Sequence, residues 1–270
     1  MLTGAASAQT YPTRNITLVL PFASGSGTDT TTRLIAAEVG KGLGQSLVVD
    51  NKPGANGMLA ATHAARAAPD GYTLFVTTNT THSANPSLMK QLTYDPVKDF
   101  TPIARTGNLP FMLVINPDIP AKTVQELTAY GKANPGKLTY ASGSSAAIVM
   151  GATYSRRTNL DLLHVPYKSS PPALTDVIGG RVSMMFIDIP TGLPLVNAGK
   201  LRGLAVTTKE RSVLLPDMRS MQEAGVPDFD ITSWQGWFGP ANMPKDVVTK
   251  LNAEVRKVIG NPAIKKQLGA

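Results

Sequence analysis

Residues 16–43 read ITLVLPFASGSGTDTTTRLIAAEVGKGL, and three parts of this stretch predict three different structures. The run Ile16–Leu20 is continuous and apolar, which is typical of a strand that is covered on both faces. Further on, Ile35, Val39 and Leu43 recur every four positions and predict the buried face of a helix. The small residues between these two segments predict the loop that joins the strand to the helix.

The same alternation of short apolar runs and helix-period segments continues along the chain. The order strand, helix, strand, helix, strand predicts a parallel sheet with right-handed crossovers, and the rhythm then repeats. The predicted strands are Ile16–Leu20, Leu47–Val49, Tyr72–Val76, Phe111–Ile115, Leu138–Ala141, Val182–Ile187, Leu201–Val206 and Trp234–Phe238. The predicted helices are Thr30–Leu43, Met58–Ala67, Thr123–Asn134 and two segments that begin near Ala146 and at Lys245.

Two α/β lobes follow from this pattern. We expect the first lobe at 11–105 plus 226–270 and the second at 106–225, with 1–10 outside both. A lobe built from both ends of the chain needs two crossings between the lobes, and these crossings would form a hinge. Clefts between such lobes commonly hold small ligands.

Composition excludes several classes of protein. With 42 % apolar and 16 % charged residues in 270, the chain has the balance of a globular protein rather than a disordered one. Cysteine is absent, which excludes disulfides, cysteine zinc sites, iron–sulfur clusters and thiol nucleophiles. The net charge of +8 is scattered rather than gathered into a basic stripe. We therefore expect no nucleic-acid partner, and a positive field that gathers small anions.

The start of the chain suggests export, and its end suggests a shortened segment. Ala6-Ser7-Ala8 fits the A-x-A pattern that precedes a signal-peptidase cut, so we interpret 1–10 as the remnant of an export signal. No apolar run approaches the roughly 18–20 residues that span a bilayer. We expect a periplasmic protein whose signal peptide has been trimmed, and a C-terminal segment shortened after Lys265–Ala270.

Two loops of small residues are the main candidate site. The loop 21–29 and the loop Ser142–Ala146 each lie between a predicted strand and a predicted helix. Bare N–H groups and hydroxyls at a helix N-terminus bind anions without any cationic side chain. The same residues also suit helix caps, which we predict at Thr28 or Asp29 in the first loop and at Ser145 in the second. Asp29 is also a candidate ligand contact.

Two enzymatic alternatives stay open at this point. Gly25 and Gly27 followed by Asp50 match part of a dinucleotide-binding fingerprint, although Thr30 stands where the third glycine belongs. The serine-rich loops could instead belong to a hydrolase, with Ser144 or Ser145 as nucleophile, although the chain has no G-x-S-x-G elbow.

The histidines give no metal site. His63, His82 and His164 are isolated, and none has a partner at metal-ligand spacing. We expect no metal and no cofactor. His82 follows a strand end in a polar stretch, so we keep it as a candidate ligand contact.

Several motifs occur together and in order along the chain. They are Pro21-Phe22, Gly25, Asp29 and Arg33; Asn51–Gly57; Pro69–Leu74; Tyr94-Asp95-Pro96 with Asp99-Phe100; His164–Lys168; Gly199–Thr208; and Glu223–Pro227. In these motifs the chain resembles the Bug family, the periplasmic TctC-type receptors of tripartite tricarboxylate transporters. The resemblance runs from Tyr11 to the C-terminus.

This resemblance implies a two-lobed Venus-flytrap protein that is not an enzyme. It would bind a small carboxylate (a dicarboxylate, tricarboxylate or aromatic carboxylate) and hand it to the integral-membrane permease subunits, acting as a monomer. Backbone amides and hydroxyls would hold the carboxylate. Carried over to this sequence, the family pattern implies ligand contacts from Phe22, Ala23, Ser24, Gly25, Ser26, Gly27, Asn56, Gly57, Thr78, Asn79, Ser142, Ser144, Ser145, Ala146, Tyr167 and Asp188.

The sequence departs from the family pattern at three positions. Ser26 replaces the usual second glycine of the first loop, and Ser169 replaces the glycine after Tyr167-Lys168. Ile148 or its neighbour stands where a histidine is common. These departures lie in or near the implied site, so they concern the choice of ligand rather than the fold.

Overall fold

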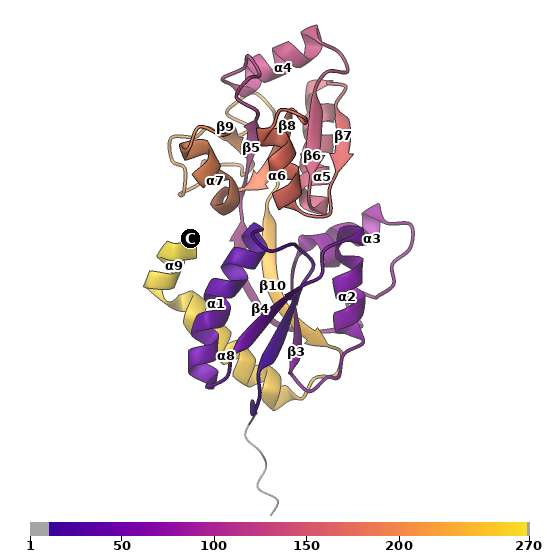
Figure 1. Cartoon of the computed structure of the whole chain (residues 1–270), viewed down its shortest axis with the longest axis vertical. Helices are drawn as coiled ribbons and strands as arrows, with labels where there is room; N and C mark the ends of the chain where they lie inside the picture. The colour runs from indigo at the N-terminus through magenta and orange to yellow at the C-terminus, as the bar shows by residue number, and fades with distance from the viewer. Residues whose placement is uncertain (1–10, 269–270) are drawn as a thin grey trace, which may run out of the picture.

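The computed structural model describes residues 11–268, so the predicted export-signal remnant and the end of the chain lie outside it. Figure 1 shows two α/β parts, one above the other, joined by strands that run between them. Each part is built on one five-stranded sheet. The predicted α/β class and two-lobed architecture are confirmed.

The first lobe contains the sheet β2-β1-β3-β10-β4. Strands β1, β2 and β3 are parallel, as predicted, but β10 runs antiparallel to both of its neighbours, so the sheet is mixed. Its strands are β1 (Ile16–Leu20), β2 (Leu47–Asn51), β3 (Thr73–Thr78), β4 (Phe100–Leu109) and β10 (Ser233–Pro240). Its helices are α1 (Gly27–Leu43), α2 (Met58–Ala65), α3 (Asn85–Leu88), α8 (Lys245–Gly260) and α9 (Pro262–Leu268), with a 3₁₀ turn at Ala55–Gly57 and a π turn at Thr80–Ala84.

The first sheet is covered on both faces. Alternate residues of a strand point to opposite faces, so Leu18 packs with Val39 of α1 and Leu251 of α8, whereas Val19 packs with Ala61 of α2 and with Phe75. All of these side chains are buried, and each large one contributes about 1.5–3 kcal/mol by leaving water. This two-sided burial is the reason why the apolar run of β1 is continuous.

The second lobe contains the sheet β7-β6-β8-β5-β9, in which β6 is parallel to β7 and β8 and β5 is antiparallel to β8 and β9. Its strands are β5 (Phe111–Ile115), β6 (Thr139–Ser142), β7 (Leu163–Pro166), β8 (Met184–Asp188) and β9 (Arg202–Val206). Its helices are α4 (Val124–Ala133), α5 (Ser145–Thr158), α6 (Ser170–Ile178) and α7 (Ile189–Asn197). Leu113 and Val114 of β5 enter different cores, so this sheet is also covered on both faces.

The chain crosses between the lobes at two places. It leaves the first sheet after Leu109, passes through Pro110 and enters the second sheet at Phe111. On the way back Phe229 still packs in the second lobe's core, and β10 begins at Ser233. Both crossings lie a few residues C-terminal to the lobe boundaries expected from sequence.

The crossings bring the carboxyl ends of β1 and β3 toward those of β6 and β8. In open α/β sheets, ligands bind beside the carboxyl ends of the strands.

None of the helices in residues 11–268 has the length and apolar character needed to cross a membrane.

Candidate functional site

Two hydrogen bonds and one close packing contact join the two lobes where these strand ends meet. The N–H of Ala23 donates to Ser169 Oγ at 3.1 Å, and Ser145 Oγ donates to Asn85 Oδ1 at 3.0 Å. The third contact packs the carboxylate of Asp188 directly against Gly27. Gly27 and Ser145 are the first helical residues of α1 and α5, so both helix N-termini touch the opposite lobe.

The first loop ends in a cap formed by Ser26. This residue is extended (φ −73°, ψ 158°), and its Oγ accepts the Asp29 N–H at 3.3 Å. The helix therefore begins at Gly27, and the predicted cap at Thr28 or Asp29 is wrong. Gly25 has φ +80°, which only glycine adopts without strain, and this turn brings the loop into the cap. The loop thus presents small residues and backbone N–H groups at the start of α1.

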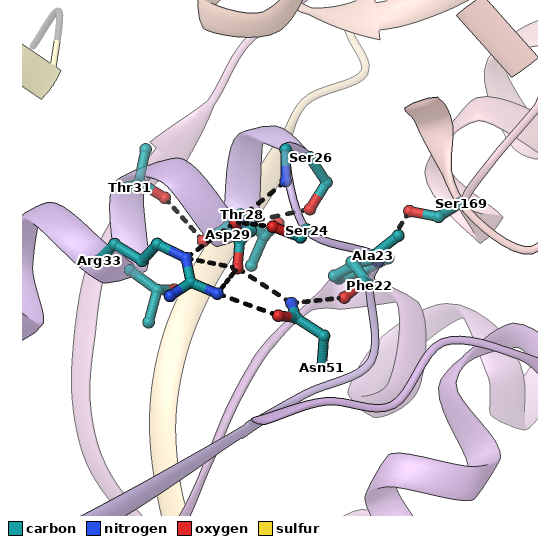
Figure 2. Close-up of polar contacts among 12 residues, drawn as sticks. Phe22, Ala23, Ser24, Ser26, Thr28, Asp29, Thr31, Arg33, Asn51 and Ser169 are labelled. Carbon is teal, nitrogen blue, oxygen red and sulfur yellow. Dashed lines mark hydrogen bonds and ion pairs between the residues drawn. The ribbon is translucent and has the colours of Figure 1, made fainter. Parts of the chain in front are cut away.

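Asp29 stabilises the first loop through the polar contacts of its side chain, as Figure 2 shows. Its carboxylate is buried and accepts hydrogen bonds from Arg33 Nε at 3.1 Å, Asn51 Nδ2 at 2.9 Å and the Gly25 N–H at 3.0 Å. Asn51 Nδ2 also donates to the carbonyl of Phe22 at 2.8 Å. Burial opposes ionisation, but the bonds from Arg33, Gly25 and Asn51 outweigh it and hold the pKa of Asp29 below its usual range.

These contacts occupy the Asp29 carboxylate within its own lobe. Asp29 therefore positions the first loop, whereas the sequence had also suggested it as a ligand contact. Ser169, in contrast, reaches the loop from the second lobe at Ala23 (Figure 2).

The second loop is capped by Ser144 rather than by Ser145. Ser144 is extended, and its Oγ accepts the Ala147 N–H at 3.3 Å, which leaves Ser145 Oγ free to donate to Asn85. Ala146 is buried in the first turn of α5.

Ser142, at the end of β6, is tied to a histidine of the neighbouring strand. Its Oγ lies 2.6 Å from His164 Nε2, and the His164 ring stacks on Tyr140 with ring centroids 4.8 Å apart. Burial lowers the pKa of His164, which favours the neutral imidazole beside this hydroxyl.

Asn85 binds the loop around Asn56 to the rest of the site. Its Nδ2 donates to the carbonyl of Asn56 at 2.8 Å, while its Oδ1 accepts from Ser145 of the other lobe. Asn56 and Gly57 both have positive φ, and a Cβ on Gly57 would lie 2.9 Å from Pro21 Cβ. The loop is therefore held against the first lobe at the position where the lobes meet.

Thr78 and Asn79 stand at the end of β3, and their side chains are used within the first lobe. Thr78 Oγ1 accepts the Thr80 N–H at 3.2 Å, and Asn79 Oδ1 accepts from Ser233 Oγ of β10 at 2.6 Å. The second bond ties this wall of the site to a crossing strand.

Tyr167 and Asp188 differ in what they offer the site. Tyr167 donates its hydroxyl to Asp176 of α6 at 2.5 Å, so this group is engaged inside the second lobe. Asp188 caps α7 by accepting the Thr191 N–H at 3.0 Å, and its carboxylate faces the first lobe at Gly27. Burial raises the pKa of Asp188.

The structure places His82 among aromatic rings of the first lobe. It stacks on Phe238 with centroids 4.2 Å apart and packs against Phe75 and Phe100. Burial lowers the pKa of His82 to about 4. Within residues 11–268, no group of three or more His, Asp or Glu side chains could hold a metal ion.

Three residues that shape the site were not among the contacts predicted from sequence. Asn51 ends β2 at the same carboxyl edge as the first loop, a position that could have pointed to it. Asn85 becomes a site residue only through its contact with Ser145 across the lobes, and no local pattern indicates it. Ser169 was noted as a departure from the family pattern, but its bond to Ala23 of the other lobe could not be predicted.

A cavity of about 280 Å³ lies beside the site, where the crossing strands meet. Gln235, Leu109 and Pro190 line it together with Thr31 and Leu268. None of the site residues predicted from sequence lines this cavity.

Two lobes, two crossings and loops that meet at the strand ends define a solute-binding protein of the periplasmic binding-protein type. The family described as "Tripartite tricarboxylate transporter family receptor", TctC, matches residues 31–270, and the chain belongs to this family. Its members and structural neighbours are binding receptors and not enzymes, which excludes the oxidoreductase and hydrolase alternatives. The resemblance found in the sequence is thereby confirmed.

Three solved structures show the likeness over the whole chain. Rpa4515 of R. palustris, solved with adipate, is 36 % identical with a TM-score of 0.94, over 96 % of this chain and 87 % of that one. MatC from Rhodopseudomonas palustris, solved with bound malate, is 36 % identical with a TM-score of 0.90, over 96 % and 90 %. The periplasmic binding protein BugD is 34 % identical with a TM-score of 0.91, over 96 % and 88 %.

Proposed function

We propose that this protein captures a small carboxylate between its lobes in the periplasm and delivers it to the membrane permease of a tripartite tricarboxylate transporter. The observation that carries the proposal is the placement of two helix N-termini, those of α1 and α5, against the opposite lobe. Each N-terminus carries partial positive charge, and its first turn has N–H groups without a partner inside the helix, of which the serine cap binds one. Similarity to the proteins solved with adipate and malate supports a carboxylate ligand.

In this proposal the first loop and the ends of β3 and β6 form the two walls. Uncharged donors would hold the carboxylate: N–H groups of the first loop on one side and hydroxyls of the second loop on the other. The proposed contacts are Phe22, Ala23, Ser24, Gly25, Ser26, Gly27, Asn56, Gly57, Thr78 and Asn79 from the first lobe, and Ser142, Ser144, Ser145, Ala146, Tyr167 and Asp188 from the second. A ligand that touches both walls would favour the closed arrangement.

A thermal-shift panel tests the proposal. Aliphatic dicarboxylates, tricarboxylates, amino acids, aromatic carboxylates and NAD are each compared with neutral amides of the same carbon skeleton. A carboxylate at about 1,000 times its dissociation constant adds about 4 kcal/mol, and each kcal/mol raises the Tm by roughly 2–4 °C for a chain of this size. We expect a carboxylate to shift the Tm and its amide to leave it unchanged. Equal shifts by both, or no shift with any carboxylate, would refute the proposal.

Two further measurements test the location and the delivery step. Fractionation of cells that express the full-length precursor should place the mature protein in the periplasm. Size-exclusion chromatography with light scattering should show that the mature protein is a monomer. Deletion of the cognate permease genes should abolish uptake of the identified ligand while binding by the purified protein persists. Uptake that survives this deletion would contradict the delivery step.

A further inference from the structure

Ser142 and His164 form a hydrogen-bonded pair on the face of the second sheet that α5 covers. Ser142 Oγ lies 2.6 Å from His164 Nε2, and Ser142 is 2 % exposed. Tyr140 packs in the core under α5, where a Cβ on Gly151 would collide with its ring. Ser142 stands two residues after Tyr140 on β6, so its side chain points to the same face of the sheet, beside the first turn of α5.

The end of β6 also lies against the point where the lobes touch. Gly143 follows Ser142 and packs on the backbone of Ser169 and Ser170 so closely that a Cβ would collide with both. Ser169 Oγ accepts the N–H of Ala23 from the first lobe at 3.1 Å. A carboxylate held at this junction would therefore lie close to Ser142.

The hydrogen bond between Ser142 and His164 can be made in two ways. A hydroxyl has one proton, and a neutral imidazole carries its proton on one of its two nitrogens. If Ser142 donates to Nε2, the serine offers a ligand only lone pairs, which repel a carboxylate. If Nε2–H donates instead, Ser142 keeps its proton for the ligand. An imidazolium carries protons on both nitrogens, so it always donates.

The protonation of His164 is set by burial and not by a charged neighbour. The ionisable side chains on the elements around it are Tyr140 on β6, Tyr154, Arg156 and Arg157 on α5, Asp176 on α6, and Asp161, Tyr167 and Lys168 on the segments that flank β7. None of them contributes to the lowering of the His164 pKa, which arises from burial alone. Without a ligand His164 is therefore neutral near pH 7, and its proton can stand on either nitrogen.

We propose that His164 is a positioning residue that turns the Ser142 hydroxyl toward a bound carboxylate by donating its Nε2–H to Ser142 Oγ. The inference rests on the proposed function and adds protons to its binding step. A bound carboxylate selects the tautomer with the proton on Nε2 and favours the imidazolium, so His164 takes up part of a proton from the solvent on binding. Affinity should consequently fall as the pH rises.

Calorimetry at pH 6.5 measures this proton uptake. The probe is the carboxylate that shifts the Tm most, with adipate and L-malate measured first. Each titration is repeated in two buffers whose heats of ionisation differ, because the difference in binding enthalpy gives the number of protons taken up. A series of Kd values from pH 6 to pH 8 completes the measurement.

Three variants separate the role of His164 from a structural one. His164→Gln places an amide N–H where His164 has its Nε2–H, but the amide does not titrate. His164→Phe keeps a ring against Tyr140 and has no donor. His63→Gln is the control, because His63 is exposed on α2 of the first lobe and its substitution also removes one imidazole.

We expect the wild type to take up roughly 0.2–0.5 proton per carboxylate more than His164→Gln. The wild-type Kd should rise about three- to tenfold from pH 6 to pH 8, whereas the Kd of His164→Gln should change less than about twofold. At pH 6.5 His164→Phe should bind about fivefold more weakly because the donor to Ser142 is lost, and His164→Gln should restore the affinity. His63→Gln should keep the wild-type proton uptake.

Three results would overturn the inference. The first is an equal proton uptake in the wild type and in His164→Gln, and the second is His164→Phe binding as tightly as the wild type. The third is the loss of the proton uptake in His63→Gln. In each case a carboxylate still binds, so the proposed function stands. If no carboxylate binds the wild type, the proposed function fails and this inference fails with it.

Discussion

Substitution of Gly27 by alanine tests whether the lobes close onto each other at this residue. The backbone of Gly27 lies outside the left-handed region, so alanine fits the first turn of α1 without strain, and alanine favours a helix over glycine by up to about 1 kcal/mol. The three atoms nearest to the new Cβ would all belong to the Asp188 carboxylate of the other lobe, at 2.7 Å or less, whereas ordinary contacts begin near 3.4 Å. The lobes can close only if one of them shifts or if the Asp188 side chain turns away and gives up its bond to the Thr191 N–H.

The magnitude follows from the cost of overpacking. Adding a methyl group to a filled contact costs about 1–3 kcal/mol, which corresponds to a roughly 5- to 150-fold weaker Kd. We expect Gly27→Ala to weaken carboxylate binding by this factor while the Tm of the ligand-free protein stays equal or rises. Calorimetry gives the Kd, and a thermal melt without ligand gives the Tm.

Two further variants show whether the collision is the cause. Asp188→Ser shortens the side chain and keeps an oxygen that caps α7, so it should restore part of the affinity of Gly27→Ala. Gly44→Ala serves as the control. Gly44 follows the C-terminal end of α1, where φ is +68° and no atom lies within 4 Å of the new Cβ. This variant should lower the Tm and leave the Kd unchanged. An unchanged Kd in Gly27→Ala, or no recovery in the double variant, would refute the reasoning.

Three other substitutions probe the supports of the site. Asp29→Ala removes the carboxylate that accepts hydrogen bonds from both the Gly25 N–H and Arg33. Calorimetry should then show at least a tenfold weaker Kd, and an unchanged Kd would exclude Asp29 as a positioning residue. Ser145→Ala removes one hydrogen bond across the lobes, about 1 kcal/mol, and stopped-flow should show roughly fivefold faster ligand release with a Tm that hardly changes. His82 has a pKa of about 4 when folded and about 6.5 when unfolded, so this residue alone should lower the free energy of unfolding by about 3 kcal/mol between pH 6.5 and 4. Urea melts at both pH values should show a loss that is smaller by this amount in His82→Phe, and an equal loss in the variant and the wild type would contradict the assignment.

The fold was predictable where burial leaves a pattern in the sequence. The continuous run of β1 and the four-residue repeat of α1 both arise because side chains face a core, and both elements form where predicted. The strand β7 contains His164 and Pro166 and lies at a sheet edge, so no apolar run indicates it. Helix α6 begins with two prolines, which suit a first helical turn but look like a break in the chain.

The site was predictable only as far as it is local. Small residues between a strand and a helix indicated both loops. The residue that caps each helix, however, lies one to three positions before the residue predicted from sequence. Ser26 rather than Thr28 or Asp29, and Ser144 rather than Ser145, take the extended conformation that a cap needs. Asn85 meets Ser145 across sixty residues of chain, through a π turn that no periodicity predicts.

The chemistry of the lobe junction indicates how the proposed ligand would control closure. Each of the eight ion pairs found in residues 11–268 has both of its partners in the same lobe. The hydrogen bonds that cross between the lobes, from Ala23 to Ser169 and from Ser145 to Asn85, join neutral groups. Neutral hydrogen bonds contribute about 1 kcal/mol each, whereas moving an equilibrium from 1:99 to 99:1 takes about 5.5 kcal/mol. These two bonds alone therefore supply only part of that energy, and under the proposed function the ligand would supply the rest. Because no ion pair within residues 11–268 joins the two lobes, we expect loss of the proposed ligand to be enough to let the lobes open.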